Sequence, residues 1–198
     1  GHKEVVKLIL EHSNKIELNL RDDLGFTAFM EACYFGHKDV VQLFLDQPDR
    51  NIDLNARDNH GITAFMHACY DGHKNVVQTI LDHSNSNIDL NARNIYGKTA
   101  FMRACNDGHK EVVQLLLEHS NKIEVNAKDN NDCTAFIMAC EKGHKDVVKL
   151  LLENSDIDTS GYKSLSQDMI DFIELHLEAS KELKRFNEIH QAKRRKLS

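Results

Sequence analysis

The chain has 198 residues and carries 25 basic against 31 acidic side chains, a net charge of −6. Residues 181–198 hold seven Lys or Arg and two Glu, a local +5, so the preceding 180 residues carry −11. An acidic body with a short basic end does not fit a protein that binds nucleic acid over its whole surface. No run is long and apolar enough to span a bilayer and no signal peptide is visible, which predicts an intracellular, cytoplasmic protein.

A sequence motif of the form Gly-His-Lys-x-Val-Val-x-x-x-Leu recurs through the chain. Its copies begin at Gly1, Gly36, Gly72, Gly108 and Gly143, with spacings of 35 or 36 residues. Self-similarity at this period indicates stacked repeats, in which each unit contacts only its neighbours. The apolar spacing after each Gly-His predicts a helix. Because the chain opens inside a repeat and lacks an initiating Met, we expect it to be part of a longer protein.

A second string lies between the Gly-His motifs, over residues 25–33, 61–69, 97–105 and 132–140. Each copy contains Thr followed by a short run such as Ala-Phe-Met-x-Ala-Cys, which predicts an N-capped helix that ends at the Gly of the next Gly-His. A helix this short is marginal alone, so its Phe, Met, Ala and Cys must be buried by the neighbouring repeat. The extra residues of the longer units fall after the second helix, within 47–51 and 84–87.

These strings resemble the ankyrin repeat family, whose usual phrase is Asp-x-x-Gly-x-Thr-Pro-Leu-His-x-Ala, over about residues 1–160. This chain has Ala for the Pro, Phe for the Leu, and Met30, Met66, Met102 or Ile137 for the His. The Thr–His hydrogen bond of the family therefore cannot form, and we expect apolar packing to compensate. Asp132 stands where the other units have Gly, which makes the fourth hairpin tip the least favourable.

The fold class that follows is all-α: an ankyrin-type helix-turn-helix solenoid with β-hairpin-like loops and a helical C-terminal cap. Residues 1–160 form the stack, with a partial first repeat and about four full repeats. Residues 161–198 form a degenerate half-repeat, a capping helix and a basic tail. Apolar residues spaced alternately by four and three run from Leu165 to Phe186, and we call this row the seam. The seam fits either a helix folded against the last repeat or a coiled coil, and we favour the capping helix.

The tail contains Lys193, Arg194, Arg195 and Lys196, a run that we expect to be disordered. It resembles a nuclear import signal, with an inert solvated tail as the alternative. Leu165, Asp168, Ile173 and Leu177 also resemble the start of an F-box, although the half-repeat explains the same residues.

Repeated Cys and His have structural explanations. Equivalent residues of stacked helices lie about 8–10 Å apart, too far for a disulfide or for one metal ion to join neighbouring copies. We therefore expect Cys33, Cys69, Cys105 and Cys140 to be buried thiols in a reducing compartment, and the histidines to brace turns.

Asn55, Asn91 and Asn126 resemble asparagines that hydroxylases modify in ankyrin repeats, but a structural role in the turn is our interpretation. No catalytic motif stands out, so we expect no enzyme activity, cofactor or metal.

The resemblance places the partner-binding surface at the hairpin tips and at the ends of the short helices. The residues carried over by position are Phe26, Glu31, Tyr34, Phe35, His60, Ile62, His67, Tyr70, Asp71, Tyr96, Lys98, Arg103, Asn106, Asp107, Met138, Glu141 and Lys142. Tyr and Arg are over-represented in binding hot spots. The predicted function is binding of a protein partner without chemistry.

Two alternatives remain open at the level of sequence. The first is self-assembly through Val5, Val6, Leu8 and Ile9 or through the seam from Leu165 to Phe186, although we favour a monomer. The second is an adaptor that recruits a ubiquitin ligase through the C-terminal segment. We expect no small-molecule substrate, no nucleic acid and no membrane among the partners.

Overall fold

The computed structural model describes residues 1–12, 16–47, 51–83 and 87–197, and the helices follow the repeats. In chain order they are α1 (Lys3–His12), α2 (Ala28–Tyr34), α3 (Lys38–Leu45), α4 (Ala64–Tyr70), α5 (Lys74–Asp82), α6 (Ala100–Asn106), α7 (Lys110–Glu118), α8 (Ala135–Glu141), α9 (Lys145–Glu153), the 3₁₀ turn η2 (Tyr162–Ser164) and α10 (Gln167–Leu197). The predicted extra residues at 48–50 and 84–86 lie outside the described residues.

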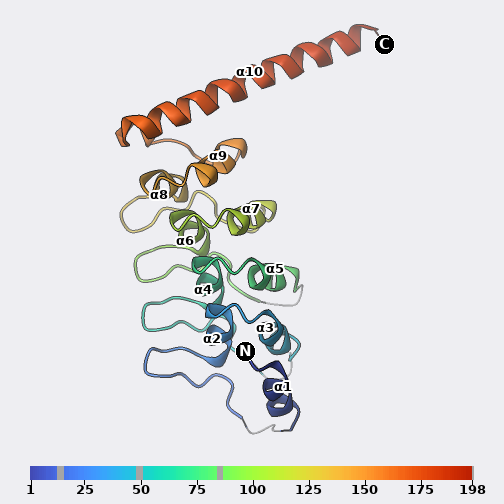
Figure 1. Cartoon of the computed structure of the whole chain (residues 1–198), viewed down its shortest axis with the longest axis vertical. Helices are drawn as coiled ribbons and strands as arrows, with labels where there is room; N and C mark the ends of the chain where they lie inside the picture. Colours follow the sequence, from blue (N-terminus) through green and yellow to red (C-terminus); the bar gives the residue numbers. More distant parts are fainter. Residues whose placement is uncertain (13–15, 48–50, 84–86, 198) are drawn as a thin grey trace.

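The repeats stack in one column (Figure 1). The short helices α2, α4, α6 and α8 form one row, the long helices α1, α3, α5, α7 and α9 form a second row, and the connecting loops project on the side away from the long helices. Short helices pack on short helices and long on long in successive repeats. This arrangement confirms the predicted all-α solenoid.

Each short helix begins at a Thr whose side chain caps it. The Thr27 hydroxyl accepts a hydrogen bond from the Met30 N–H at 3.2 Å, and Thr63, Thr99 and Thr134 repeat this contact three residues on. In two of the loops before these helices, antiparallel bridges join Arg57 to Thr63 and Lys128 to Thr134. The predicted caps and hairpin-like loops are therefore present.

Each short helix ends at a glycine in the left-handed conformation. At Gly36, φ is 69°, and the His37 N–H reaches back to the Ala32 carbonyl at 2.8 Å. This is a Schellman-type end, which satisfies carbonyls that the helix leaves unpaired. A Cβ added to Gly36 would lie 2.6 Å from Nδ1 of His73 in the next repeat. Glycine is therefore required both for the turn and for the close approach of the next histidine.

The Gly-His histidines join neighbouring repeats, which accounts for their recurrence. His73 Nε2 lies 2.8 Å from the Tyr34 carbonyl, His109 Nε2 2.6 Å from the Tyr70 carbonyl and His144 Nε2 3.0 Å from the Asn106 carbonyl. Because a carbonyl only accepts, Nε2 carries the proton in each contact. The predicted turn-bracing role is confirmed, and the contact also ties one repeat to the preceding one.

A column of asparagines makes a second set of bonds between repeats. The Asn55 side chain donates to the Asn87 carbonyl at 2.8 Å and accepts from the Asp89 N–H at 2.7 Å. Asn91 and Asn126 make the same pair of bonds with the following loop. The structural interpretation of these asparagines is confirmed.

One continuous apolar core runs the length of the stack. Its largest members recur at the same place in each unit: Phe29, Phe65, Phe101 and Phe136 are 1% exposed. Met30, Met66 and Met102, which replace the family His, are equally buried, as expected if apolar packing compensates for the lost hydrogen bond, whereas Ile137 at the fourth such position is half-buried against the core. Burying one such side chain contributes about 1.5–3 kcal/mol.

The five cysteines are free thiols. Cys33, Cys69, Cys105 and Cys140 are buried in the core, as predicted. Burial raises the pKa of the Cys33, Cys69 and Cys105 thiols far above the usual range, and that of Cys140 to about 12. These thiols therefore behave as small apolar core groups.

Asp132 adopts the left-handed conformation of the glycines that it replaces, with φ of 61°. The fourth tip still forms, because the Asp129 carboxylate accepts from the Asn131 N–H at 2.9 Å and from the Cys133 N–H at 3.0 Å. Asp22, Asp58 and Asn94 hold the other tips in the same way. The strain at Asp132 is tolerated locally rather than relieved by a different turn.

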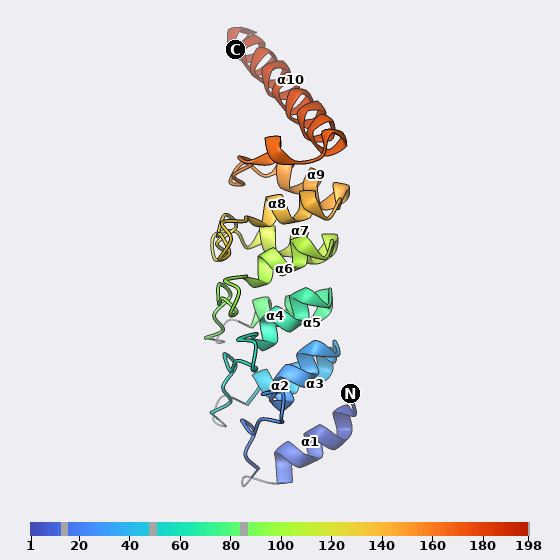
Figure 2. The same cartoon turned by 90° about the vertical axis from the view of Figure 1, so that its left-hand side faces the viewer.

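The C-terminal helix α10 crosses the end of the stack and packs against α9, with Met169 and Ile173 buried (Figures 1 and 2). Its later turns extend beyond the repeats. The helix continues through Leu197, so the expectation of a disordered run at Lys193–Lys196 is wrong. Lys and Arg are good helix formers, no Gly or Pro interrupts α10, and cations near a helix C-terminus are favourable.

Candidate partner-binding surface

The predicted binding residues belong to the short helices and the hairpin loops, which together form one side of the stack, here called the short-helix face (Figure 1). The ends of α2, α4, α6 and α8 supply Tyr34, Phe35, Tyr70, Asp71, Asn106, Asp107, Glu141 and Lys142. The hairpins supply Phe26, His60, Ile62, Tyr96 and Lys98, and the short helices themselves Glu31, His67, Arg103 and Met138. The stack thus brings residues more than 100 positions apart onto one side.

Aromatic side chains are exposed at the end of the first two short helices. Tyr34 is 37% exposed, Phe35 57% and Tyr70 38%; we call these three residues the aromatic patch. The rings of Tyr34 and Phe35 meet edge to face at 4.9 Å, and Phe35 stacks on His37 at 6.1 Å. Packing of this kind holds large apolar surfaces in fixed positions while leaving them open to solvent.

Two of the predicted residues are buried. His67 is 5% exposed, because the rings of Phe26 and Tyr34 lie over it at 4.7 and 5.4 Å. Met138 is 3% exposed, because its apolar side chain joins the core. Neither side chain is exposed on the surface where it was predicted: His67 supports the surface from beneath, and Met138 is a core residue.

A buried pair couples the second hairpin to α4. His67 Nε2 lies 3.0 Å from Asp58 Oδ2, while Asp58 Oδ1 accepts the His60 and Ile62 N–H groups at 2.8 and 2.9 Å. Burial lowers the pKa of His67, although the hydrogen bond and charge of Asp58 raise it. A neutral imidazole donating to the carboxylate fits this site. Asp58 was not among the predicted residues. The sequence signal that could have identified it is the spacing: of the repeats, only this one has an Asp nine positions before a His.

Arg103 stacks on the aromatic patch. Its guanidinium carbon lies 3.8 Å from the centroid of the Tyr70 ring, a cation–π contact that bridges α6 and α4. Beneath it is a small pocket of about 60 Å³, lined by Tyr34, Ile62, Met66, His67, Tyr70, Asn94 and Arg103. Single-sequence reasoning could select Arg103 and the tyrosines but not this pocket, which requires three repeats to be assembled.

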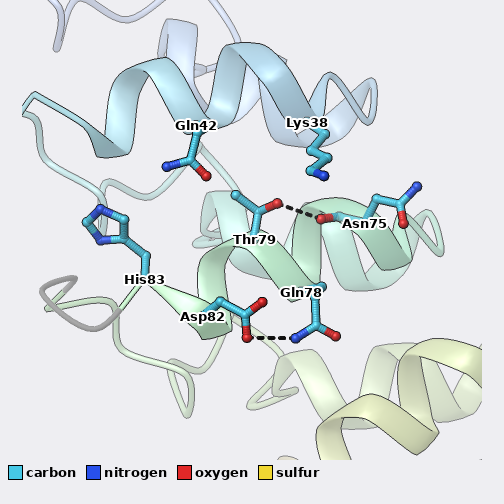
Figure 3. A pocket seen from close by; sticks show the side chains of 7 residues that line it. All are labelled: Lys38, Gln42, Asn75, Gln78, Thr79, Asp82 and His83. Atoms are coloured by element: carbon cyan, nitrogen blue, oxygen red, sulfur yellow. Dashed lines mark hydrogen bonds between the residues drawn. The ribbon is translucent and has the colours of Figure 1, made fainter.

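A larger, polar pocket of about 280 Å³ lies between the long helices α3 and α5 (Figure 3). It is lined by Lys38, Gln42, Asn75, Gln78, Thr79, Asp82 and His83. Thr79 stands where α3, α7 and α9 carry Leu43, Leu115 and Leu150, which leaves room at this position. The side chains of Gln42, Gln78 and Thr79 already bond within their own helices, so this hollow presents little unmet hydrogen bonding.

The described part of the chain contains no group of three or more His, Cys, Asp or Glu side chains arranged to hold a metal ion. The predicted import run, Lys193–Lys196, lies on the last turns of α10, and its side chains are outside the described part. None of the described helices combines the length and the apolar character needed to cross a bilayer.

The comparisons with known proteins agree with this architecture. A family model described as ankyrin repeats (3 copies) matches residues 1–94 and 84–161. The chain is also similar to the probable E3 ubiquitin-protein ligase XBOS32 of Oryza sativa subsp. japonica and to the E3 ubiquitin-protein ligase XBAT33 of Arabidopsis thaliana. Each similarity is 49% identity over 45 residues, which is 23% of this chain but only 9% and 8% of those proteins. The chain spans less than a tenth of these relatives.

Proposed function

Because the chain belongs to the ankyrin repeat family, we propose that it is a non-catalytic scaffold that binds a protein partner through the short-helix face. The observation that carries this proposal is the aromatic patch of Tyr34, Phe35 and Tyr70, exposed on one side of a continuously packed stack. Tyr, together with the neighbouring Arg103, is among the residues enriched in binding hot spots. Scattered exposed apolar residues need no explanation, but neighbouring aromatic residues on a rigid surface do.

The mechanism is preorganisation. The histidine and asparagine bonds between repeats fix the separation of successive units, so the side chains of several repeats are already in register before a partner arrives. Little ordering entropy is then lost on association. Beyond the patch, exposed Tyr96, Glu141 and Lys142 extend the surface toward α8 and provide polar contacts at its edge.

Affinity capture with a triple variant, Tyr34→Ala, Tyr70→Ala and Tyr96→Ala, tests the proposal. Removing three aromatic contacts should weaken partner binding by at least about thirtyfold, since truncation of one hot-spot residue often costs about 2 kcal/mol. A matched variant, Lys38→Ala, Lys74→Ala and Lys110→Ala, changes exposed residues at the starts of long helices and should recover the same partners as the native protein. Recovery of those partners by the tyrosine variant would exclude the short-helix face.

A second candidate function is recruitment of a ubiquitin ligase through α10, favoured by the names of the two similar plant proteins. The apolar residues that resemble an F-box, and those at the start of the seam, are not fully exposed for such a contact. They lie at the start of α10 and just before it and are buried or half-buried: Leu165, Met169, Ile173 and Leu177. A recruiting contact would instead use Leu175, which is 65% exposed. Leu175→Asp should then abolish co-purification of a ligase while leaving the unfolding midpoint unchanged.

Self-assembly is a third candidate, favoured by the exposed apolar side of α1. Val5, Leu8 and Ile9 are 54%, 57% and 42% exposed, and Val6 is half-buried. Light scattering of the native protein and of Leu8→Glu separates this candidate from a monomeric scaffold. A native mass of one chain at high concentration would dismiss assembly through α1.

A further inference from the structure

The small pocket under Arg103 has an apolar interior. Met66, 1% exposed, and the half-buried Ile62 contribute apolar side chains, and the lining surface is almost entirely carbon. Two polar groups in the wall are already used: His67 Nε2 bonds to Asp58, and Asn94 Oδ1 accepts the Tyr96 and Lys98 N–H groups at 3.0 Å. An apolar group therefore enters at lower cost than a polar one.

The size of the pocket limits its occupant. The volume of about 60 Å³ is less than half that of an engineered cavity that binds benzene, which measures about 150 Å³. The pocket can admit the branched end of an aliphatic side chain but not an aromatic ring. Tyr34 and Tyr70, both more than one-third exposed, flank the pocket and leave it reachable from solvent.

The cationic side chain that lines the pocket is Arg103. The Arg103 guanidinium lies over the Tyr70 ring, and it forms no ion pair with any carboxylate among the described residues. Asp71 lies near enough to interact with Arg103 through space, but the two side chains are not hydrogen bonded. A guanidinium held by a ring and not paired to a carboxylate favours an anionic group from outside, and a planar carboxylate matches its donors.

We propose that this pocket binds a branched aliphatic side chain, Val, Leu or Ile, from an extended partner segment in which an adjacent Asp or Glu pairs with Arg103. The proposal rests on the proposed function and names the chemistry of its partner. The aliphatic group replaces solvent in the pocket, and the carboxylate sets the direction of the segment across α4 and α6. A neighbouring Lys or Arg in the segment would face the guanidinium and be repelled.

The methionines provide a direct readout. The chain has five, and of these Met66 lines the pocket whereas Met138 and Met169 lie in α8 and α10. With ¹³C-methyl-labelled methionine, titration of the full chain with the peptide acetyl-Gly-Leu-Glu-Gly-amide should shift the Met66 methyl signal and leave Met138 and Met169 unmoved. The Lys-for-Glu peptide should bind about 1.4- to fivefold more weakly, the range of an exposed ion pair. The Ala-for-Leu peptide should not shift Met66.

Arg103→Gln is the matched variant: it should abolish the preference for the Glu peptide over the Lys peptide while the Leu peptide still shifts Met66. Equal binding of the Glu and Lys peptides to the native chain, or no Met66 shift at the solubility limit of the peptides, overturns the inference. If the tyrosine variant loses its partner while Met66 does not respond, only the pocket inference fails. If the tyrosine variant keeps every partner, the proposed function itself fails.

Discussion

At the scale of single residues, His67 is the clearest case of a side chain whose role is set by its neighbours. The same position holds Glu31 in the preceding repeat and Arg103 in the following one, and these remain at least partly exposed. His67 is covered because Phe26 and Tyr34 lie above it, and it is tolerated there because Asp58 accepts a hydrogen bond from its Nε2–H. A buried polar group without such a partner would cost about 1–3 kcal/mol.

This pair predicts a specific pH dependence. Burial lowers the pKa of His67 in the folded state below its ordinary value of about 6.5. As the pH falls below about 6.5, His67 binds a proton in the unfolded chain but remains neutral in the folded chain. The free energy of unfolding therefore decreases until the pH reaches the folded-state pKa. We expect His67→Gln, which can still donate to Asp58, to remove this contribution. Urea unfolding at a series of pH values measures the difference.

The rest of the chain is common to both proteins, so the informative quantity is the native-minus-variant difference in the free energy of unfolding. That difference should decline on acidification through this range. His60→Gln, at an exposed hairpin tip, is the matched control for replacing an imidazole with an amide. A flat difference for His67→Gln would mean that Asp58 offsets burial, and a difference that grows on acidification would mean that Asp58 outweighs it.

His109 tests the contact between repeats. Its Nε2–H donates to the Tyr70 carbonyl at 2.6 Å, and its ring packs against Gly72. His109→Ala should destabilise the chain by about 1–2 kcal/mol, since it removes the bond and leaves the carbonyl without that donor. His60→Ala should change stability by less than about 0.5 kcal/mol. Similar unfolding midpoints for the two variants would refute a joining role for the His column.

At the scale of elements, the fourth hairpin carries a correctable strain. Asp132 has φ of 61°, a region that costs most residues about 1–2 kcal/mol and is less unfavourable for Asp. Asp132→Gly should stabilise the chain by about 0.5 kcal/mol, because the gain exceeds the entropy that Gly adds to the unfolded state. Asp132→Ala should destabilise it. Thermal unfolding of the two variants gives opposite shifts in Tm if strain, rather than a side-chain contact, dominates.

Elements of this kind are largely predictable from sequence because their causes are local. Thr27 and its equivalents cap the next helix by accepting a hydrogen bond from the N–H three residues later. Gly36 adopts a positive φ, which depends on the residue type at that position alone. The end of α10 was predicted wrongly because charge alone suggested disorder, whereas helix propensity and the absence of a breaker favour continuation. The pocket under Arg103 was not predictable, since its walls come from positions up to 69 residues apart, Tyr34 to Arg103.

At the scale of the whole molecule, stability depends on neighbours. One apolar core passes through every repeat, and each short helix packs against the short helix of the adjacent repeat, with α4 and α6 covered on both sides. Such a stack behaves approximately as a sum of repeat and interface terms, and its ends need a covering with a polar outer side. The amphipathic start of α10 supplies this covering at the α9 end, with Ile173 0% exposed and Leu175 65% exposed.

These two residues give a matched test of the cap. Ile173→Ala should lower the free energy of unfolding by about 2–4 kcal/mol, the range for truncating a buried aliphatic side chain, whereas Leu175→Ala should change it by less than about 0.5 kcal/mol. Because coupling runs from neighbour to neighbour, the loss should begin at the end of the stack. Amide hydrogen exchange should therefore accelerate in α8 and α9 well before α2 and α3. Equal acceleration in all repeats would mean that the chain unfolds as a single unit and that α10 stabilises it globally rather than as a local cap.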